Sequence, residues 1–246
     1  MGADANRPLA GVKVVESSLL GPGLVTTFLA DLGADVIKVE PPAGDYVRQM
    51  TWPIIEGNSL LHLHTHRGKR SICLDLKTEV GLEIYRDLVR NADVVVEAMR
   101  PGSLAKLGLG FEDLQAVNPR IVFCTLSGYG ATGPYRDMPS HGIAYDTWAG
   151  LIEPVVDDEG FTRIPVLPNV GINVGPMVAA LGILAASGQL AAEAIEVNLD
   201  WCVDGSGERV EEDQRYDLAL IYRYTHQAWE LIDQHLASSV PALRFD

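Results

Sequence analysis

Between Gly11 and Leu126, short runs of β-branched residues alternate with segments whose apolar residues recur at helical spacing. Such runs are typical of buried strands, and the spaced pattern is typical of helices packed on them. The predicted strands are residues 12–17, 34–40, 71–76, 93–99 and 120–126, with helices over 21–33 and 77–92. Repeated strand–helix alternation with short links indicates a parallel sheet covered by helices on both faces. We therefore predict an α/β, Rossmann-like fold.

The remaining segments are predicted with less regular patterns. Residues 103–119 are expected to form two short helices, and Thr78 is expected to cap the helix over 77–92. In the second half, residues 141–152 and 175–187 are predicted helices and residues 194–200 a strand. A long helical pattern covers residues 210–239, so a C-terminal helix is expected.

Composition excludes several classes of protein. With 47% hydrophobic and 21% charged residues, the chain can bury a core, which excludes a disordered or fibrous protein. Its longest nearly apolar stretch, residues 175–187, is too short to cross a bilayer, and no signal peptide is visible, so a cytoplasmic protein without membrane contact is expected. The three cysteines lack the spacing of a disulfide framework or a zinc site, and no metal site is predicted.

The net charge of −14 is unevenly distributed. Residues 1–120 hold 13 Lys and Arg against 15 Asp and Glu, a balance of −2, whereas residues 121–246 hold 6 against 18, a balance of −12. An acidic chain is a poor general binder of nucleic acid, so no nucleic-acid partner is expected. An anionic ligand would find its cations in the first half.

Five cations follow or precede predicted strands. Because ligands of such sheets sit beyond the carboxyl ends of the strands, these side chains could converge on a polyphosphate, for which guanidinium groups are well shaped. The alternative is a solvated surface turn. The five residues are Arg48, Arg67, Lys69, Arg70 and Arg100.

Two glycine-rich segments and one helix start are further candidates. Gly21 and Gly23 precede a helix whose N–H groups could hold an anion, but no GxGxxG fingerprint of a dinucleotide site is present. Residues 127–139 form a glycine-rich loop that could approach a ligand or simply connect two elements. His141 and Asp146 lie near the start of a predicted helix, where they could be catalytic or structural.

Read in order, these segments resemble the family III CoA-transferases, a group typified by formyl-CoA transferase and carnitine CoA-transferase that shares its fold with α-methylacyl-CoA racemase. The resemblance is carried by residues 8–45, 66–110 and 118–139, and more weakly by 170–186 and 195–200. It implies that the ligand is a coenzyme A thioester, acting as a substrate, with no tightly bound cofactor. It also implies that the CoA-contacting residues are Leu20, Gly21, Arg48, Lys69, Arg70, Ala98, Met99, Arg100 and Lys106.

The catalytic positions depart from the pattern that the resemblance implies. In the transferases an aspartate attacks the thioester carbonyl, and the matching position here is Gly142. In the racemases a histidine, matched by His141, works with a carboxylate from a later stretch, and that position is Ile172. Asp146, one helical turn after Gly142, could replace the missing nucleophile or could be structural. We therefore predict Asp146 and His141 as the catalytic residues.

The resemblance also implies a smaller second domain after the strand at 194–200, and interlocked dimers. The match fades after Asp200, so we expect a CoA-binding domain over residues 1–200, a divergent, mainly helical segment over 201–246, and no second domain. A homodimer, or a partner chain that supplies the missing domain, is expected. The predicted function is transfer of coenzyme A between carboxylic acids; the alternatives are a non-catalytic CoA-binding subunit and an acyl-CoA racemase or isomerase.

Overall fold

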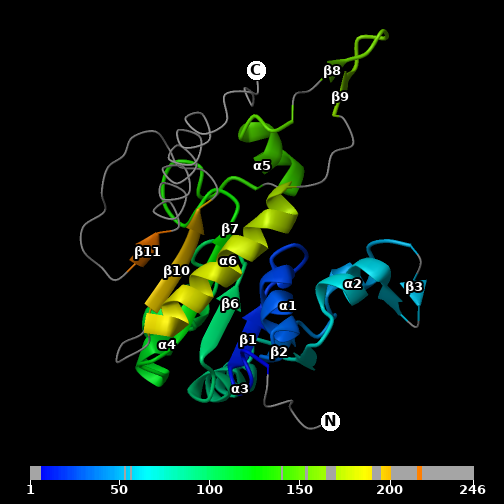
Figure 1. Cartoon of the computed structure of the whole chain (residues 1–246). Coiled ribbons are helices and arrows are strands. Elements are labelled where there is room, and N and C mark those ends of the chain that lie inside the picture. Colours follow the sequence, from blue (N-terminus) through cyan, green and yellow to red (C-terminus); the bar gives the residue numbers. More distant parts are fainter. Residues whose placement is uncertain are drawn as a thin grey trace, which may run out of the picture.

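The computed structural model describes residues 7–52, 54–55, 57–139, 141–152, 155–164, 170–189, 195–200 and 215–217 (Figure 1). Its centre is a seven-stranded sheet with the strand order β11-β10-β7-β6-β1-β2-β5, in which every neighbouring pair is parallel. This confirms the predicted fold class. The strands are β1 (Lys13–Ser17), β2 (Asp35–Glu40), β5 (Arg70–Cys73), β6 (Val94–Glu97), β7 (Val122–Ser127), β10 (Ile195–Asp200) and β11 (Arg215–Asp217).

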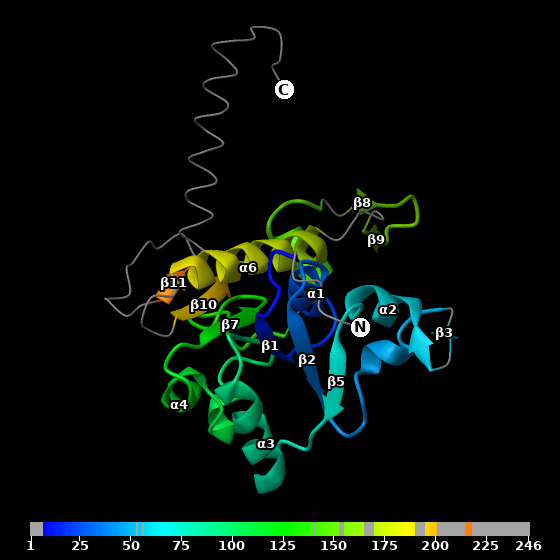
Figure 2. The same ribbon diagram turned by 60° about the horizontal axis from the view of Figure 1, so that its bottom comes forward.

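Helices cover both faces of this sheet, as Figure 2 shows. On one face lie α1 (Gly23–Asp31) and α6 (Val170–Gln189), and on the other lie α3 (Glu79–Arg90) and α4 (Phe111–Val117). Successive side chains of a strand point to opposite faces, so Val14 packs with α1 and α6 whereas Val15 packs with α3 and α4. Burial on both faces explains why the central strands β1, β6 and β7 are nearly continuous apolar runs in the sequence.

Smaller elements lie around this core. Thr78 caps α3 as predicted, because its hydroxyl oxygen accepts a hydrogen bond from the Gly81 N–H at 3.1 Å. Of the two short helices predicted before β7, the first is a 3₁₀ turn and the second is α4. The other small elements are η1 (Tyr46–Gln49), β3 (Ile54–Ile55), β4 (Asn58–Ser59), α2 (Leu60–Thr65), η2 (Ala105–Leu107), α5 (Gly142–Trp148), β8 (Val155–Val156) and β9 (Thr162–Arg163).

Helix α6 differs most from its prediction. It begins at Val170 rather than at residue 175 and contains Pro176, so the apolar segment runs for 20 residues. By length and composition a helix of this kind could cross a membrane. In this chain its inner face, including Ala179 and Ile183, is buried against the sheet, as in the core helix of an α/β domain.

The C-terminal prediction is only partly covered by the structure. The helix expected over residues 210–239 is wrong at Arg215–Asp217, which form strand β11 beside β10. The rest of that predicted helix lies outside the described residues, as does most of the segment 201–246.

The order of the strands creates one position where the chain reverses direction along the sheet. From β1 the chain adds β2 and β5 on one side, and it then returns to add β6, β7 and β10 on the other. The segments that leave β1 and β6 therefore diverge to opposite faces. A crevice at the carboxyl ends of two such strands is the usual ligand position in an open parallel sheet.

Candidate functional site

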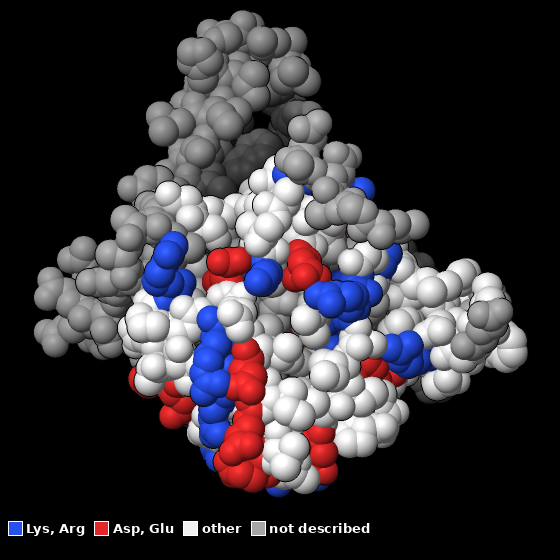
Figure 3. Space-filling view, turned by 90° about the horizontal axis from the view of Figure 1, so that it is seen from below, with Lys and Arg blue, Asp and Glu red and all other residues white. Residues whose placement is uncertain are grey.

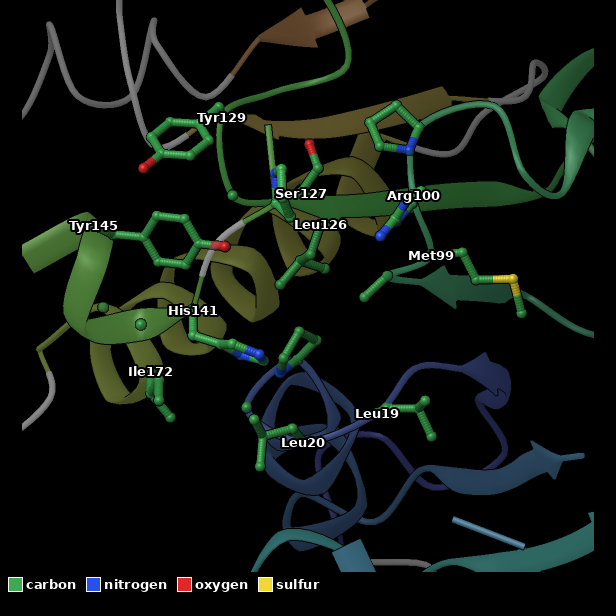
Figure 4. Close-up of a pocket in the computed structure, with 18 of the residues that line it drawn as sticks. Leu19, Leu20, Met99, Arg100, Leu126, Ser127, Tyr129, His141, Tyr145 and Ile172 are labelled. Atoms are coloured by element: carbon green, nitrogen blue, oxygen red, sulfur yellow. The ribbon is translucent and has the colours of Figure 1, made fainter. Parts of the chain in front are cut away.

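A cavity of about 560 Å³ lies at this reversal point, beyond the carboxyl ends of β1, β6 and β7 (Figure 4). The segments that follow these three strands form its walls, together with the first turns of α5 and α6. Residues far apart in the sequence thus meet in one place. The main lining residues are Leu19, Leu20, Gly21, Pro22, Ala98, Met99, Arg100, Leu126, Ser127, Gly128, Tyr129, Arg136, Asp137, Met138, His141, Gly142, Tyr145, Ile172 and Pro176.

The turn between β1 and α1 brings two of the predicted CoA-contacting residues, Leu20 and Gly21, to the cavity wall. Leu20 has a φ of 58°, and it is the one non-glycine residue in the described part of the chain with a positive φ. A branched side chain in this region is strained, and such residues concentrate at functional sites. The strained backbone of Leu20 therefore makes the turn between β1 and α1 a candidate part of the functional site.

The segment after β6 places three more of the predicted residues, Ala98, Met99 and Arg100, in the wall. The Glu97 carboxylate accepts a hydrogen bond from the Met99 N–H at 2.8 Å and so shapes this turn. Arg136, from the glycine-rich loop, also lines the cavity, and its guanidinium donates to the Pro101 carbonyl at 3.4 Å. Arg136 therefore contacts the segment that carries Arg100, and both cations line the same cavity. The sequence prediction missed Arg136, although its position in a post-strand loop is the signal that could have found it.

Aromatic side chains join the glycine-rich loop to α5. Tyr129 packs edge-on against Tyr145 at 5.4 Å and against Trp148 at 6.0 Å between ring centroids. A side chain at Gly128 would overlap Tyr145, since an added Cβ would lie 2.0 Å from its hydroxyl oxygen. Gly128 thus allows Tyr145 to lie across the backbone of the loop, as Figure 4 shows.

The two positions where the resemblance predicts acidic groups lie against each other. Gly142 starts α5 directly after His141, and a Cβ added to it would lie 2.4 Å from Cγ1 of Ile172 at the start of α6. His141 is exposed and lines the cavity beside them. At this corner the chain has an imidazole and a hydrocarbon side chain, and neither of the two matched positions carries a carboxylate.

Asp146, the other predicted catalytic residue, is buried and does not line the cavity. Its Oδ1 accepts a hydrogen bond of 2.7 Å from the Gly171 N–H in the first turn of α6. The first N–H groups of a helix lack partners within it, and a carboxylate there also favours the helix dipole. This geometry supports a structural role for Asp146. Asp137 is the carboxylate that the described residues do present to the cavity.

Lys69, predicted to contact CoA, belongs instead to a buried ionic network. Its Nζ lies 2.7 Å from Glu16 and donates to the Gly23 carbonyl at 2.6 Å, while Lys38 contacts Glu16 and Asp45 at 3.2 and 3.0 Å. Burial lowers the pKa of Lys69 to about 8 although Glu16 opposes the shift. Burial alone would raise the pKa of Glu16, but Lys69 and Lys38 hold it below its ordinary value. The network joins β1, β2, α1 and the start of β5.

The other predicted cations are also engaged away from the cavity lining. Arg48 pairs with Glu40 at 2.6 Å, and Arg70 pairs with Asp35 at 2.7 Å at the amino end of the sheet. Lys106 is exposed on η2. The face shown in Figure 3 has basic side chains lying beside acidic ones. The hypothesis that five cations converge is therefore wrong, because Arg67 likewise pairs with Asp31 and only Arg100 of the five lines the cavity.

In the part of the chain that the structure describes, no group of three or more His, Cys, Asp or Glu side chains could hold a metal ion. The site is thus a cavity at a strand-order reversal, where two arginines, one aspartate and one histidine lie among mainly apolar lining residues. Fold and cavity define a ligand-binding α/β domain of the doubly wound class.

Comparison with known proteins identifies the family. The family model described as CoA-transferase family III matches residues 9–194, and the chain belongs to this family. It is 39% identical over 154 residues to the succinyl-CoA–L-malate CoA-transferase beta subunit of Chloroflexus aurantiacus, covering 58% of this chain and 38% of that protein. It is 41% identical over 162 residues to the succinate–glutarate CoA-transferase of Agrobacterium fabrum, covering 62% and 40%.

Solved structures agree with this membership. A CaiB/BaiF family protein from Brucella suis superimposes with a TM-score of 0.70 at 35% identity, covering 78% of this chain and 53% of that one. Rv3272 from Mycobacterium tuberculosis gives 0.69 at 34% identity, covering 77% and 54%. The chain spans about two fifths of the length of the curated relatives it matches.

Proposed function

We propose that this chain binds a coenzyme A thioester in the reversal-point cavity and serves in transfer of coenzyme A between two carboxylic acids. The observation that carries the proposal is the meeting of Leu20, Gly21 and Arg100 in one cavity, in a chain that belongs to CoA-transferase family III. Arg100 and Arg136 would hold phosphate groups of CoA, for which guanidinium is well suited.

The reaction needs a carboxylate that attacks the thioester carbonyl. Attack by a carboxylate oxygen forms a mixed anhydride and releases the CoA thiolate. The thiolate then attacks the other carbonyl of the anhydride, which forms a new thioester and releases the original acid. Where the attacking carboxylate belongs to the enzyme, this thioester is an aspartyl-CoA, and the acceptor acid takes the CoA from it by the same two steps in reverse, which frees the enzyme carboxylate. His141, which lines the cavity beside Ile172, would donate a hydrogen bond to the oxyanion at this step.

The source of an enzyme carboxylate is part of the proposal. Asp146 is our predicted nucleophile, but its burial and its bond to Gly171 weigh against it. Asp137 lines the cavity and is the stronger candidate by position. We further propose that a second copy of the chain, or a partner chain, contributes to the site. We place this activity in the cytoplasm.

Transfer of CoA to a labelled acid tests the proposal. The full chain is incubated with acetyl-CoA or succinyl-CoA and a labelled free acid, and formation of the labelled thioester is followed. Arg100→Ala should weaken CoA affinity at least about tenfold, because a charge-assisted contact is lost. Arg70→Ala makes the same chemical change at the opposite end of the sheet and should have no effect. Absence of exchange with every donor, also after addition of a partner chain, would contradict the transferase function.

A further inference from the structure

The side chain of Ile172 fills a hole made by two glycines from different elements. A Cβ added to Gly21, in the turn after β1, would lie 3.0 Å from Cγ2 of Ile172, and one added to Gly142 would lie 2.4 Å from Cγ1. A Cβ at Gly142 would overlap Ile172, and one at Gly21 would make a contact tighter than most that real Cβ atoms make, so Ile172 would have to shift to accept a side chain at either position. The two glycines therefore admit one bulky hydrocarbon group to this corner of the cavity.

The corner around Ile172 is lined mainly by hydrocarbon. Leu20, Pro22 and Pro176 line the cavity with it, and His141 supplies the polar group beside it. Arg100 and Met99 lie on the opposite side, at the end of β6, and Arg136 is hydrogen bonded to that same segment (Figure 4). The cavity thus has a cationic end and an apolar end.

These ends fit different parts of an acyl-CoA. The phosphates need the arginines, so the acyl group is left for the end near Ile172 and His141. Among the described residues around Ile172 and His141 there is no arginine or lysine, so a free carboxylate on the acyl group would be buried there without a cationic partner, which is costly. A hydrocarbon chain would instead gain from burial, by about fourfold in affinity for each methylene.

We propose that Ile172 forms the end wall of an acyl pocket, and that this pocket selects aliphatic acyl groups over dicarboxylate ones. The inference rests on the proposed binding of CoA thioesters and adds the class of acyl group. By this inference the chain differs in its preferred acyl group from the relatives whose names specify succinyl-CoA.

Calorimetric titration of the full chain with matched ligands tests the selectivity. Butyryl-CoA and succinyl-CoA have the same chain length and differ in a terminal methyl against a carboxylate, and free CoA serves as the reference. We expect butyryl-CoA to bind at least about tenfold more tightly than succinyl-CoA. If CoA does not bind, the proposed function fails and this inference falls with it. If CoA binds but succinyl-CoA binds as tightly as butyryl-CoA, the acyl selectivity alone is wrong.

Substitution of Ile172 tests the wall itself. Ile172→Ala should deepen the pocket, so the affinity for hexanoyl-CoA should rise relative to butyryl-CoA by at least about fourfold, the gain of one more buried methylene. Val174→Ala makes a similar change on the same helix, on an exposed side chain outside the cavity lining, and should leave the ratio unchanged. If the alanine variant does not fold, Ile172→Val should move the ratio in the same direction by about twofold. An unchanged ratio in a folded Ile172 variant with normal CoA affinity would show that Ile172 is not the wall.

Discussion

Replacement of Asp146 distinguishes a structural carboxylate from a catalytic one. The side chain is 2% exposed and its Oδ1 accepts the Gly171 N–H at 2.7 Å. Asp146→Ala removes this acceptor and leaves a helix N–H without a partner. Loss of a capping side chain costs about 0.5–2 kcal/mol, and a buried hydrogen bond to a charged group is worth about 1.5–3 kcal/mol. We therefore expect a loss of about 2 kcal/mol in the free energy of unfolding.

Asp146→Asn is the matched variant that removes the charge of Asp146 but keeps a hydrogen-bond acceptor. The asparagine side-chain oxygen can still accept from Gly171, so the loss should stay within about 1 kcal/mol. For a domain of this size, each kcal/mol lowers the melting temperature by about 2–4 °C. The alanine variant should therefore melt about 4–8 °C below the parent chain and the asparagine variant within about 4 °C of it. Asp158→Ala, on an exposed residue, is the control and should not shift the transition.

Melting by calorimetry and CoA exchange are measured on the same preparations. With a structural Asp146, exchange by the asparagine variant stays within a few fold of the parent. A folded Asp146→Asn variant with no exchange would refute the structural reasoning and restore Asp146 as the nucleophile. An unchanged melting temperature for Asp146→Ala would refute the capping role directly.

Three further predictions concern other parts of the chain. Asp137→Asn should lower CoA exchange at least about tenfold without lowering the melting temperature, because Asp137 lines the cavity and is exposed; an active variant in the exchange assay would exclude it as the nucleophile. Thr78→Ala should cost about 1 kcal/mol in urea unfolding through loss of the α3 cap, whereas an equally stable variant would contradict the capping bond. Burial and the neighbouring His66 lower the pKa of His62 to about 4. Between pH 6.5 and 4 the unfolded chain therefore binds a proton at this residue that the folded chain does not bind. The free energy of unfolding should fall as the pH drops through that window. His62→Leu should reduce this slope by up to about 1.4 kcal/mol per pH unit in urea unfolding, and an unchanged slope would assign the pH dependence to other groups.

The sheet was predictable because its signal is local. The central strands β1, β2, β6 and β7 are rich in β-branched and apolar residues and are largely buried. Helix α3 carries a clear helical periodicity of its own, and Thr78 caps it as residues 77–92 predict. The order of elements then indicates a parallel sheet. The cavity position follows from the same reasoning, since the segments after β1, β6 and β7 do line it.

The errors arose where distant residues decide the outcome. Lys69 lies in a sequence that is typical of a surface turn. Its ion-pair partner, Glu16, is 53 residues away in the chain. The start of α6 contains Gly171 and, about a turn later, Pro176, and both residues disfavour a helix. The helix begins there because the Asp146 carboxylate, 25 residues before Gly171, caps its first turn. The role of Ile172 likewise becomes apparent only once the fold places it against Gly21 and Gly142. Propensity cannot anticipate contacts of this kind.

The strand order has a consequence for how the chain folds. The two strands that flank the reversal point, β1 and β6, pair Val14 with Val94, so they can join only after a loop of 80 residues has closed. Long-range parallel pairing of this kind is slow compared with the formation of helices. The ligand cavity needs that pairing, and it also needs the first turn of α6, which comes later in the sequence. A refolding chain should therefore regain its helical signal first and its ability to bind ligand last.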